Sequence, residues 1–81
     1  MWQNLRKRGD SLFIVMEIQV FSDGNMSTPC YAYDNKNSAE AKYYSILSSA
    51  AVSKLPKHSA VLLTDDGYYI NSASYEHKGG E

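Results

Sequence analysis

One segment of this chain has a clear helical pattern, and it limits what the rest of the sequence can form. Residues 37–56, NSAEAKYYSILSSAAVSKLP, carry apolar side chains at helical spacing. Asn37 stands three residues ahead of Glu40, which predicts an N-terminal capping box with Asn as the cap. Pro56 predicts the end of the helix, because the residue before a proline is disfavoured in helical dihedrals. The expected apolar side of this helix consists of Tyr43, Tyr44, Ile46, Leu47, Ala50, Ala51 and Leu55.

Length, composition and charge exclude several classes of protein. The chain has 81 residues, enough for one small domain, and its 43% hydrophobic content argues against disorder. A net charge of −1 makes duplex nucleic acid an unexpected partner. The single cysteine, Cys30, cannot form an internal disulfide, which is typical of a reducing cytoplasm. The longest apolar run, Leu12–Met16, is too short to span a membrane. We therefore expect a cytoplasmic protein without a membrane anchor.

The two ends of the chain differ in composition from the rest. Residues 1–11 show no periodicity and contain the basic triplet Arg6-Lys7-Arg8. This segment is either a phosphate-binding arm or a flexible leader outside the folded unit, and we favour the leader. Residues 78–81 form a short polar tail. The expected folded domain is therefore 12–77.

Four other stretches predict strands. They span residues 12–21, 26–33, 59–64 and 68–76. Residues 12–21 alternate in side-chain character, as a half-buried strand does. The second stretch contains Pro29, which lacks a backbone donor and so predicts an edge position. Turns are expected at Ser22-Asp23-Gly24-Asn25 and at Asp65-Asp66-Gly67, where glycine permits positive φ.

The resulting order, ββαββ, predicts an α+β fold. We expect a four-stranded antiparallel sheet with the strand order 2-1-3-4 and one helix on one face. The residues of the first strand expected beneath the helix are Leu12, Ile14, Met16, Ile18 and Val20. The uncovered face is then expected to form an oligomer interface through Phe13, Val15, Phe21 and Leu62. Because an exposed apolar face favours association, we expect a homo-oligomer, most simply a two-fold dimer.

Residue patterns that carry catalysis are weak. The two histidines, His58 and His77, do not stand at metal-ligand spacing with other ligands. Cys30 with His58 is a conceivable thiol–imidazole pair, but a lone cysteine in a strand is usually a small apolar residue. Asp65-Asp66 is a conceivable cation site, but it is first of all a turn sequence. No glycine-rich phosphate loop follows a strand. We expect no enzymatic activity, cofactor or metal.

Tyrosine content favours a binding role. Seven tyrosines in 81 residues supply rigid, amphipathic surfaces that stack on planar groups. The N-terminus of a helix attracts anions through free amides and the helix dipole. The residues expected to bind a ligand are Tyr33, Asn35, Asn37, Lys42, Tyr43, Lys57, His58 and Tyr75. The alternative is that most of the tyrosines are core residues or lie on a solvated sheet face.

The chain also resembles a family of short proteins from phages and prophages of gut Firmicutes. The resemblance covers residues 13–77, and its matching positions are Glu17, Ile18, Gln19, Asp23, Gly24, Asn37, Ala39, Glu40, Lys42, Tyr43, Ala50, Ala51, Pro56 and His58. The family carries no established activity. The resemblance implies an accessory or virion-associated role in a phage-infected bacterium, without a mechanism.

Two functional hypotheses follow from these observations. In the first, the protein is a non-enzymatic phage anti-defence protein that sequesters a nucleotide-type immune signal as a homo-oligomer. In this role the protein resembles, in size and in forming oligomers only, the small "sponge" proteins that sequester nucleotide immune signals. In the second, it is a structural or assembly protein whose free sheet face mediates packing between proteins. We favour the first narrowly, because a packing module needs neither the tyrosines nor Lys42 and His58.

Overall fold

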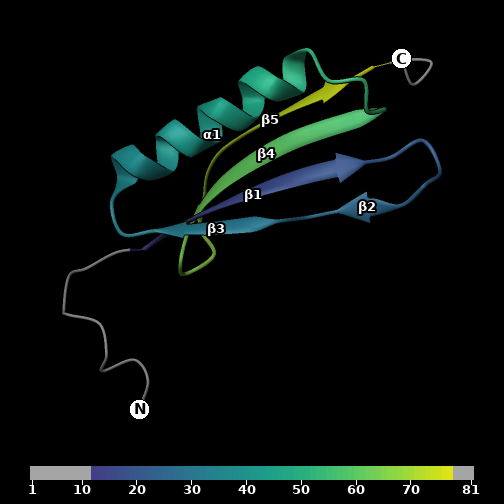
Figure 1. Ribbon diagram of the computed structural model, residues 1–81. Coiled ribbons are helices and arrows are strands. Elements are labelled where there is room, and N and C mark those ends of the chain that lie inside the picture. The colour runs from purple at the N-terminus through teal and green to yellow at the C-terminus, as the bar shows by residue number, and fades with distance from the viewer. Residues whose placement is uncertain (1–11, 78–81) are drawn as a thin grey trace.

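The computed structural model describes residues 12–77 and has one helix on one face of an antiparallel sheet (Figure 1). Its elements are β1 (Phe13–Val20), β2 (Met26–Ser27), β3 (Cys30–Tyr33), α1 (Lys36–Ala51), β4 (Lys57–Thr64) and β5 (Tyr69–Glu76). The α+β class and the antiparallel sheet with a single helix are confirmed. The expected basic leader, 1–11, and the expected tail, 78–81, lie outside the described residues.

The sheet has five strands where the sequence predicted four. Its order is β2-β1-β4-β5, and β3 also pairs with β1. The expected second strand, 26–33, is divided into β2 and β3 at Thr28 and Pro29. Proline has no N–H for the ladder, but its carbonyl accepts a hydrogen bond of 2.9 Å from the backbone N–H of Glu17. This bond joins the interruption to β1, so both short strands lie along the same edge.

Both predicted turns are present, and each uses a glycine in the left-handed region. Gly24 has φ of 91° and Gly67 has φ of 89°. The N–H of Gly24 donates to the carbonyl of Phe21 at 2.9 Å, and that of Gly67 donates to the carbonyl of Thr64 at 3.0 Å. A side chain at either position would strain the backbone, since L-residues rarely adopt this φ.

The start of α1 differs from the sequence prediction. The N-cap is Asn35, with extended dihedrals, and its side-chain oxygen accepts a hydrogen bond of 2.8 Å from the backbone N–H of Ser38. Asn37 is already inside the helix and exposed. The predicted capping box of Asn37 and Glu40 is therefore wrong. Two asparagines lie two residues apart, and the chain uses the one that follows the end of β3 most closely.

The end of α1 also comes earlier than predicted. The helix ends at Ala51, five residues before Pro56. The carbonyl of Ala50 accepts hydrogen bonds from the N–H of Ser53 at 3.2 Å and from Nε2 of His77 at 2.9 Å. A side chain just beyond the end of β5 thus satisfies a terminal carbonyl of the helix. The end of α1 therefore coincides with a tertiary contact and not with the proline.

The core lies between α1 and the sheet. Its buried cluster consists of Val15, Ala39, Tyr43, Ile46, Ala60 and Leu62, with Phe13, Tyr31, Tyr33, Leu47 and Ile70 packed against it. The buried positions of the helix are spaced by four, three and four residues, as one helical face requires. Tyr44 and Ala51, expected on that face, are exposed instead.

The predicted assignment of the faces of β1 is wrong. Val15 is fully buried and Leu62 is 1% exposed, both within the core beneath the helix. Phe13 packs against the same cluster, while Phe21 follows β1 and belongs to the turn. Because side chains alternate along a strand, the other set on β1 points away from the helix. The interface predicted from Phe13, Val15, Phe21 and Leu62 is therefore misplaced.

Candidate functional site

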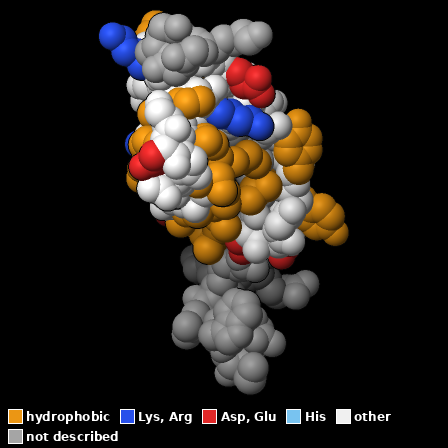
Figure 2. All heavy atoms as spheres, turned by 90° about the vertical axis from the view of Figure 1, so that its right-hand side faces the viewer, with side chains coloured by type: hydrophobic (Ala, Val, Ile, Leu, Met, Phe, Trp, Pro, Cys, Tyr) orange, Lys and Arg blue, Asp and Glu red, His pale blue; other side chains and the backbone are white. Residues whose placement is uncertain are grey.

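The face of the sheet opposite α1, called the open face below, is covered by no other described element (Figure 1). Strand register and alternation give its apolar residues as Ile14, Met16, Ile18, Val20, Met26, Ala32, Val61 and Leu63. Figure 2 shows hydrophobic side chains gathered in a continuous patch, with a basic and an acidic side chain at its upper border. Such a patch on a small protein marks an interaction surface.

The open face carries one charge of each sign along its strands. Lys57 of β4 and Glu76 of β5 are cross-strand partners, and both are exposed. Register places both on the face that Val61 and Ser74 share. The strand residues of the open face therefore have no net charge, and the two charges lie together at one end.

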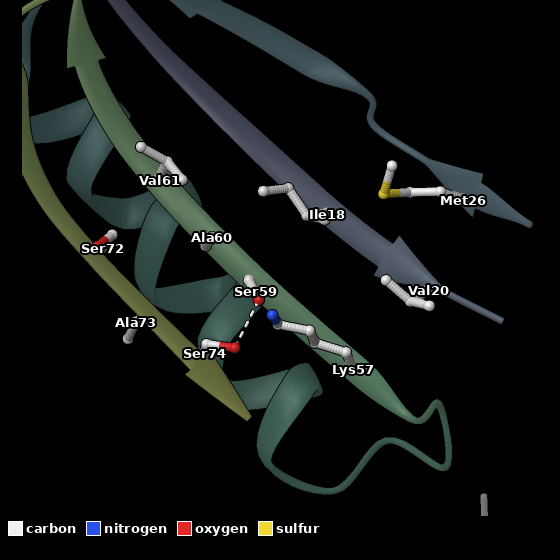
Figure 3. Close-up of a pocket in the computed structure, with 10 residues that line it drawn as sticks. All are labelled: Ile18, Val20, Met26, Lys57, Ser59, Ala60, Val61, Ser72, Ala73 and Ser74. Atoms are coloured by element: carbon white, nitrogen blue, oxygen red, sulfur yellow. Dashed lines mark hydrogen bonds between the residues drawn. The ribbon is translucent and has the colours of Figure 1, made fainter. Parts of the chain in front are cut away.

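A groove of 320 Å³ lies at the Lys57 end of the open face (Figure 3). One wall is aliphatic and comes from Ile18, Val20 and Met26. The other wall carries hydroxyl groups, from Ser59 of β4 and from Ser72 and Ser74 of β5. In Figure 3 the Lys57 side chain extends along β4 between these walls. The groove therefore offers an aliphatic surface, hydroxyls and one ammonium group.

Small side chains produce the hollow. Ser59 of β4 and Ser72 and Ser74 of β5 present short side chains to the open face, opposite the longer aliphatic residues. The hydroxyl of Ser59 donates to the hydroxyl of Ser74 at 2.8 Å, and Ser59 is only 7% exposed. This bond fixes one hydroxyl pair across the two strands, so the polar wall is pre-positioned.

A buried acid–imidazole pair lies on the other face, beneath the helix. Nε2 of His58 is 2.6 Å from Oε2 of Glu17, which joins β1 to β4. The side chains are 5% and 16% exposed, respectively. A contact this short is typical of a hydrogen bond to an ionised partner. The pair accounts for a glutamate on the helix-facing side of β1.

The surroundings of His58 assign its tautomer. Its Nδ1 is buried and has no hydrogen-bond partner among residues 12–77. A protonated Nδ1 would be an unsatisfied buried donor, whereas a bare Nδ1 leaves only an acceptor unpaired. We therefore assign the proton to Nε2, which donates it to Glu17. In this arrangement the pair is a structural element with no access from the groove, which lies on the opposite face.

A third cluster lies near the N-terminal half of α1. The ammonium of Lys42 is 4.2 Å from the centre of the Tyr31 ring, a cation–π contact. Tyr33 is half-buried and packs against the core, while Asn35 and Asn37 are exposed. This end of the molecule thus retains part of the expected ligand-binding set.

Tyr43 and Tyr75, both expected to bind a ligand, differ in their exposure to solvent. Tyr43 is 1% exposed and belongs to the core, so it is not part of a binding surface. Burial raises the pKa of Tyr43 above its ordinary value, and its neighbours Tyr44, Tyr69 and Tyr75 raise it further. Tyr75 is 39% exposed and lies across from His58 in the β4–β5 ladder.

The eight expected ligand-binding residues therefore do not form one site within a protomer. His58 is buried on the helix side, whereas its neighbour Lys57 points to the open face. Lys42 lies over Tyr31 on the helix side. Residues adjacent in a strand point to opposite faces, and the sequence analysis placed Lys57 and His58 in a loop, where this restriction would not apply.

The catalytic alternatives gain no geometric support from residues 12–77. Cys30 is exposed and pairs with Met16 of the open face, whereas His58 is buried on the other face. The thiol and the imidazole are thus separated by the sheet. No group of three or more histidine, cysteine, aspartate or glutamate side chains in the described part of the chain is arranged to hold a metal ion.

The sequence analysis did not identify the groove or Glu17 as members of a site. Strand pairing brings Ser59 and Ser74 together across 15 residues, and Glu17 and His58 across 41. The one available signal was the polar pair Glu17 and Gln19 in an otherwise apolar strand, which indicates a distant polar partner. That signal does not name the partner.

Comparisons with known proteins give no further assignment. No protein-family model, no curated protein and no solved structure matches the chain. Within residues 12–77, no helix has the length and apolar character that crossing a membrane requires.

Proposed function

We propose that this protein is a non-enzymatic interaction protein that acts as a homo-oligomer, with its open face packed against the open face of a second copy. The observation that carries the proposal is the apolar strip along the centre of the open face. Ile14, Met16 and Ile18 stand beside Val61 and Leu63 in the β1–β4 ladder, and all five are only partly buried. A second sheet would remove this strip from water, as in a two-layer sheet sandwich.

The small size of the core supports this proposal. Among residues 12–77 the buried hydrophobic residues are Val15, Ala39, Tyr43, Ile46, Ala50, Ala60 and Leu62, so three of these seven are alanines. A chain of this length is near the lower limit at which one core is sufficient, and oligomerisation is one way to bury more apolar area. A second copy supplies the missing layer.

Charge also supports a second copy as the partner. An interface with two-fold symmetry brings the same patch together with itself, so a patch of one sign would repel its copy. The open face carries Lys57 and Glu76 and no net charge along its strands. The patch is therefore compatible with its own copy.

The test is a mass measurement on the protein and two variants with the same substitution. At micromolar concentration we expect the wild type to have twice the 9.1 kDa chain mass in sedimentation equilibrium. Val61→Glu places a carboxylate at the centre of the open face and should yield single chains. Val52→Glu, at an 81% exposed position after α1, should leave the oligomer intact. A wild type of single-chain mass would contradict the proposal.

Sequestration of a nucleotide-type ligand, the phage anti-defence role, is the second candidate. The Lys42–Tyr31 contact favours it, since a cation beside an aromatic ring suits a phosphate and a base. Thermal-shift measurements with cyclic di- and trinucleotides separate the candidates. A rise of several degrees that Lys42→Ala abolishes supports sequestration, and unchanged unfolding curves leave packing through the open face as the function.

A further inference from the structure

The groove at the Lys57 end of the open face has a ligand chemistry of its own. We infer that it binds a small aliphatic monoanion, such as a medium-chain carboxylate, with the anionic group at Lys57 and the chain along Ile18, Val20 and Met26. The inference rests on the proposed function in one respect, because the sheet of a second copy would close a groove that one sheet leaves open.

The expected position of the ligand's anionic group follows from the surroundings of Lys57. Of the described residues that line the groove it alone is charged, and it makes no ion pair within that part of the chain. Glu76 lies across from it in the ladder but does not line the groove, so covering the open face would leave the ammonium without an ion-pair partner on its groove side, which is costly. An anion bound beside Lys57 offsets that cost, and the hydroxyls of Ser59 and Ser74 are next to it in the groove.

The expected hydrocarbon chain of the ligand follows from the aliphatic wall of the groove. Ile18, Val20 and Met26 have flexible or branched aliphatic side chains, and none of the described residues that line the groove is aromatic. Planar bases bind by stacking on rings, so this wall suits a hydrocarbon chain better than a base. The unbranched Met26 side chain adapts to irregular apolar ligands.

The volume agrees with a small ligand. At 320 Å³ the groove lies near the lower end of the range of ligand pockets, roughly 300–1,000 Å³. Two packed sheets do not leave hollows of this size empty when they are lined largely by carbon. Either a ligand or a side chain of the second copy fills it, and the experiment below distinguishes the two.

Isothermal titration calorimetry on the full chain tests the inference with decanoate as the probe. We expect decanoate to bind, with decanol at least about tenfold weaker because it lacks the charge. Lys57→Gln should weaken decanoate binding by a similar factor. Lys54→Gln, which removes an exposed lysine outside the groove, is the matched control and should bind as the wild type does.

Glu76→Gln supplies a variant with the opposite expected effect. Glu76 lies across from Lys57 in the ladder and repels an incoming carboxylate, so its removal should tighten binding a few-fold. If Glu76 of the second copy were the partner of Lys57, this substitution would instead weaken the oligomer and leave decanoate binding no tighter. Equal affinities for decanoate and decanol, or no heat with decanoate, would also overturn the inference.

The same samples separate failure of this inference from failure of the proposed function. A protein with twice the chain mass that binds no decanoate contradicts only the ligand. A single-chain protein that binds decanoate in a Lys57-dependent way contradicts only the packing of two open faces.

Discussion

At the scale of single residues, the Glu17–His58 pair is the least expected feature of the molecule. Each partner lies on the helix-facing side of a central strand, and the contact is 2.6 Å. We expect Glu17→Gln to lower the free energy of unfolding by about 1–2 kcal/mol, because a neutral amide replaces an ionised acceptor. His58→Ala should cost about 3 kcal/mol or more, since it leaves a largely buried carboxylate unpaired. Urea unfolding followed by circular dichroism measures both.

Asp66→Asn is the matched control for the stability measurement. Asp66 is exposed between β4 and β5, away from the open face, and takes part in no ion pair with another described residue. Its substitution should change the free energy of unfolding by no more than about 0.5 kcal/mol. Equal effects of Glu17→Gln and Asp66→Asn would mean that the buried pair contributes nothing beyond the fit of its side chains.

At the scale of elements, the sequence was sufficient where the signal is local. Glycines at positions 24 and 67 predicted both turns, and helical periodicity predicted the existence of α1. The faces of β1 were predicted wrongly because both alternating sets contain large apolar residues. The choice between them depends on β4, where Leu62 and Ala60 face the helix and His58 satisfies Glu17. Pairing over this distance leaves no trace in the pattern of one strand.

The functional site was harder to predict for the same reason. Lys57 was selected as a ligand-binding residue and does line the groove, but its expected neighbour there, His58, points to the other face. The serines opposite Lys57 have no motif in the sequence, since only the β4–β5 register aligns Ser59 with Ser74.

The two asparagines at the start of α1 permit a test on one element. Asn35→Ala removes the acceptor for the N–H of Ser38 and should cost about 1 kcal/mol of stability. Asn37→Ala, two residues further on, changes an exposed helical residue to the best helix former and should be neutral or slightly stabilising. Chemical unfolding of the two variants side by side measures the difference. If Asn37→Ala lowered the stability more than Asn35→Ala, the N-cap would be Asn37.

At the scale of the whole molecule, the small core beneath the helix and the uncovered open face both leave apolar area to be buried. In the part of the chain that the structure describes, a single helix covers one side of the sheet, and three of the seven buried hydrophobic residues are alanines. The other side retains a strip of half-buried aliphatic residues along β1 and β4. If a second copy covers that strip, folding and association are one equilibrium, and stability depends on protein concentration.

Thermal unfolding at several concentrations measures this coupling directly. For a two-chain native state, each tenfold rise in concentration adds about 1.4 kcal/mol per dimer to the apparent stability, which raises the midpoint by a few degrees. The same series on Val61→Glu should give a lower midpoint that does not change with concentration, because that variant folds without a partner. Val52→Glu should follow the wild type. The contradicting outcome is a wild-type midpoint that stays constant over a concentration range on the order of a hundredfold, from about 1 µM to about 100 µM. It would show that one helix and one sheet are stable alone, and that a second copy does not explain the open face.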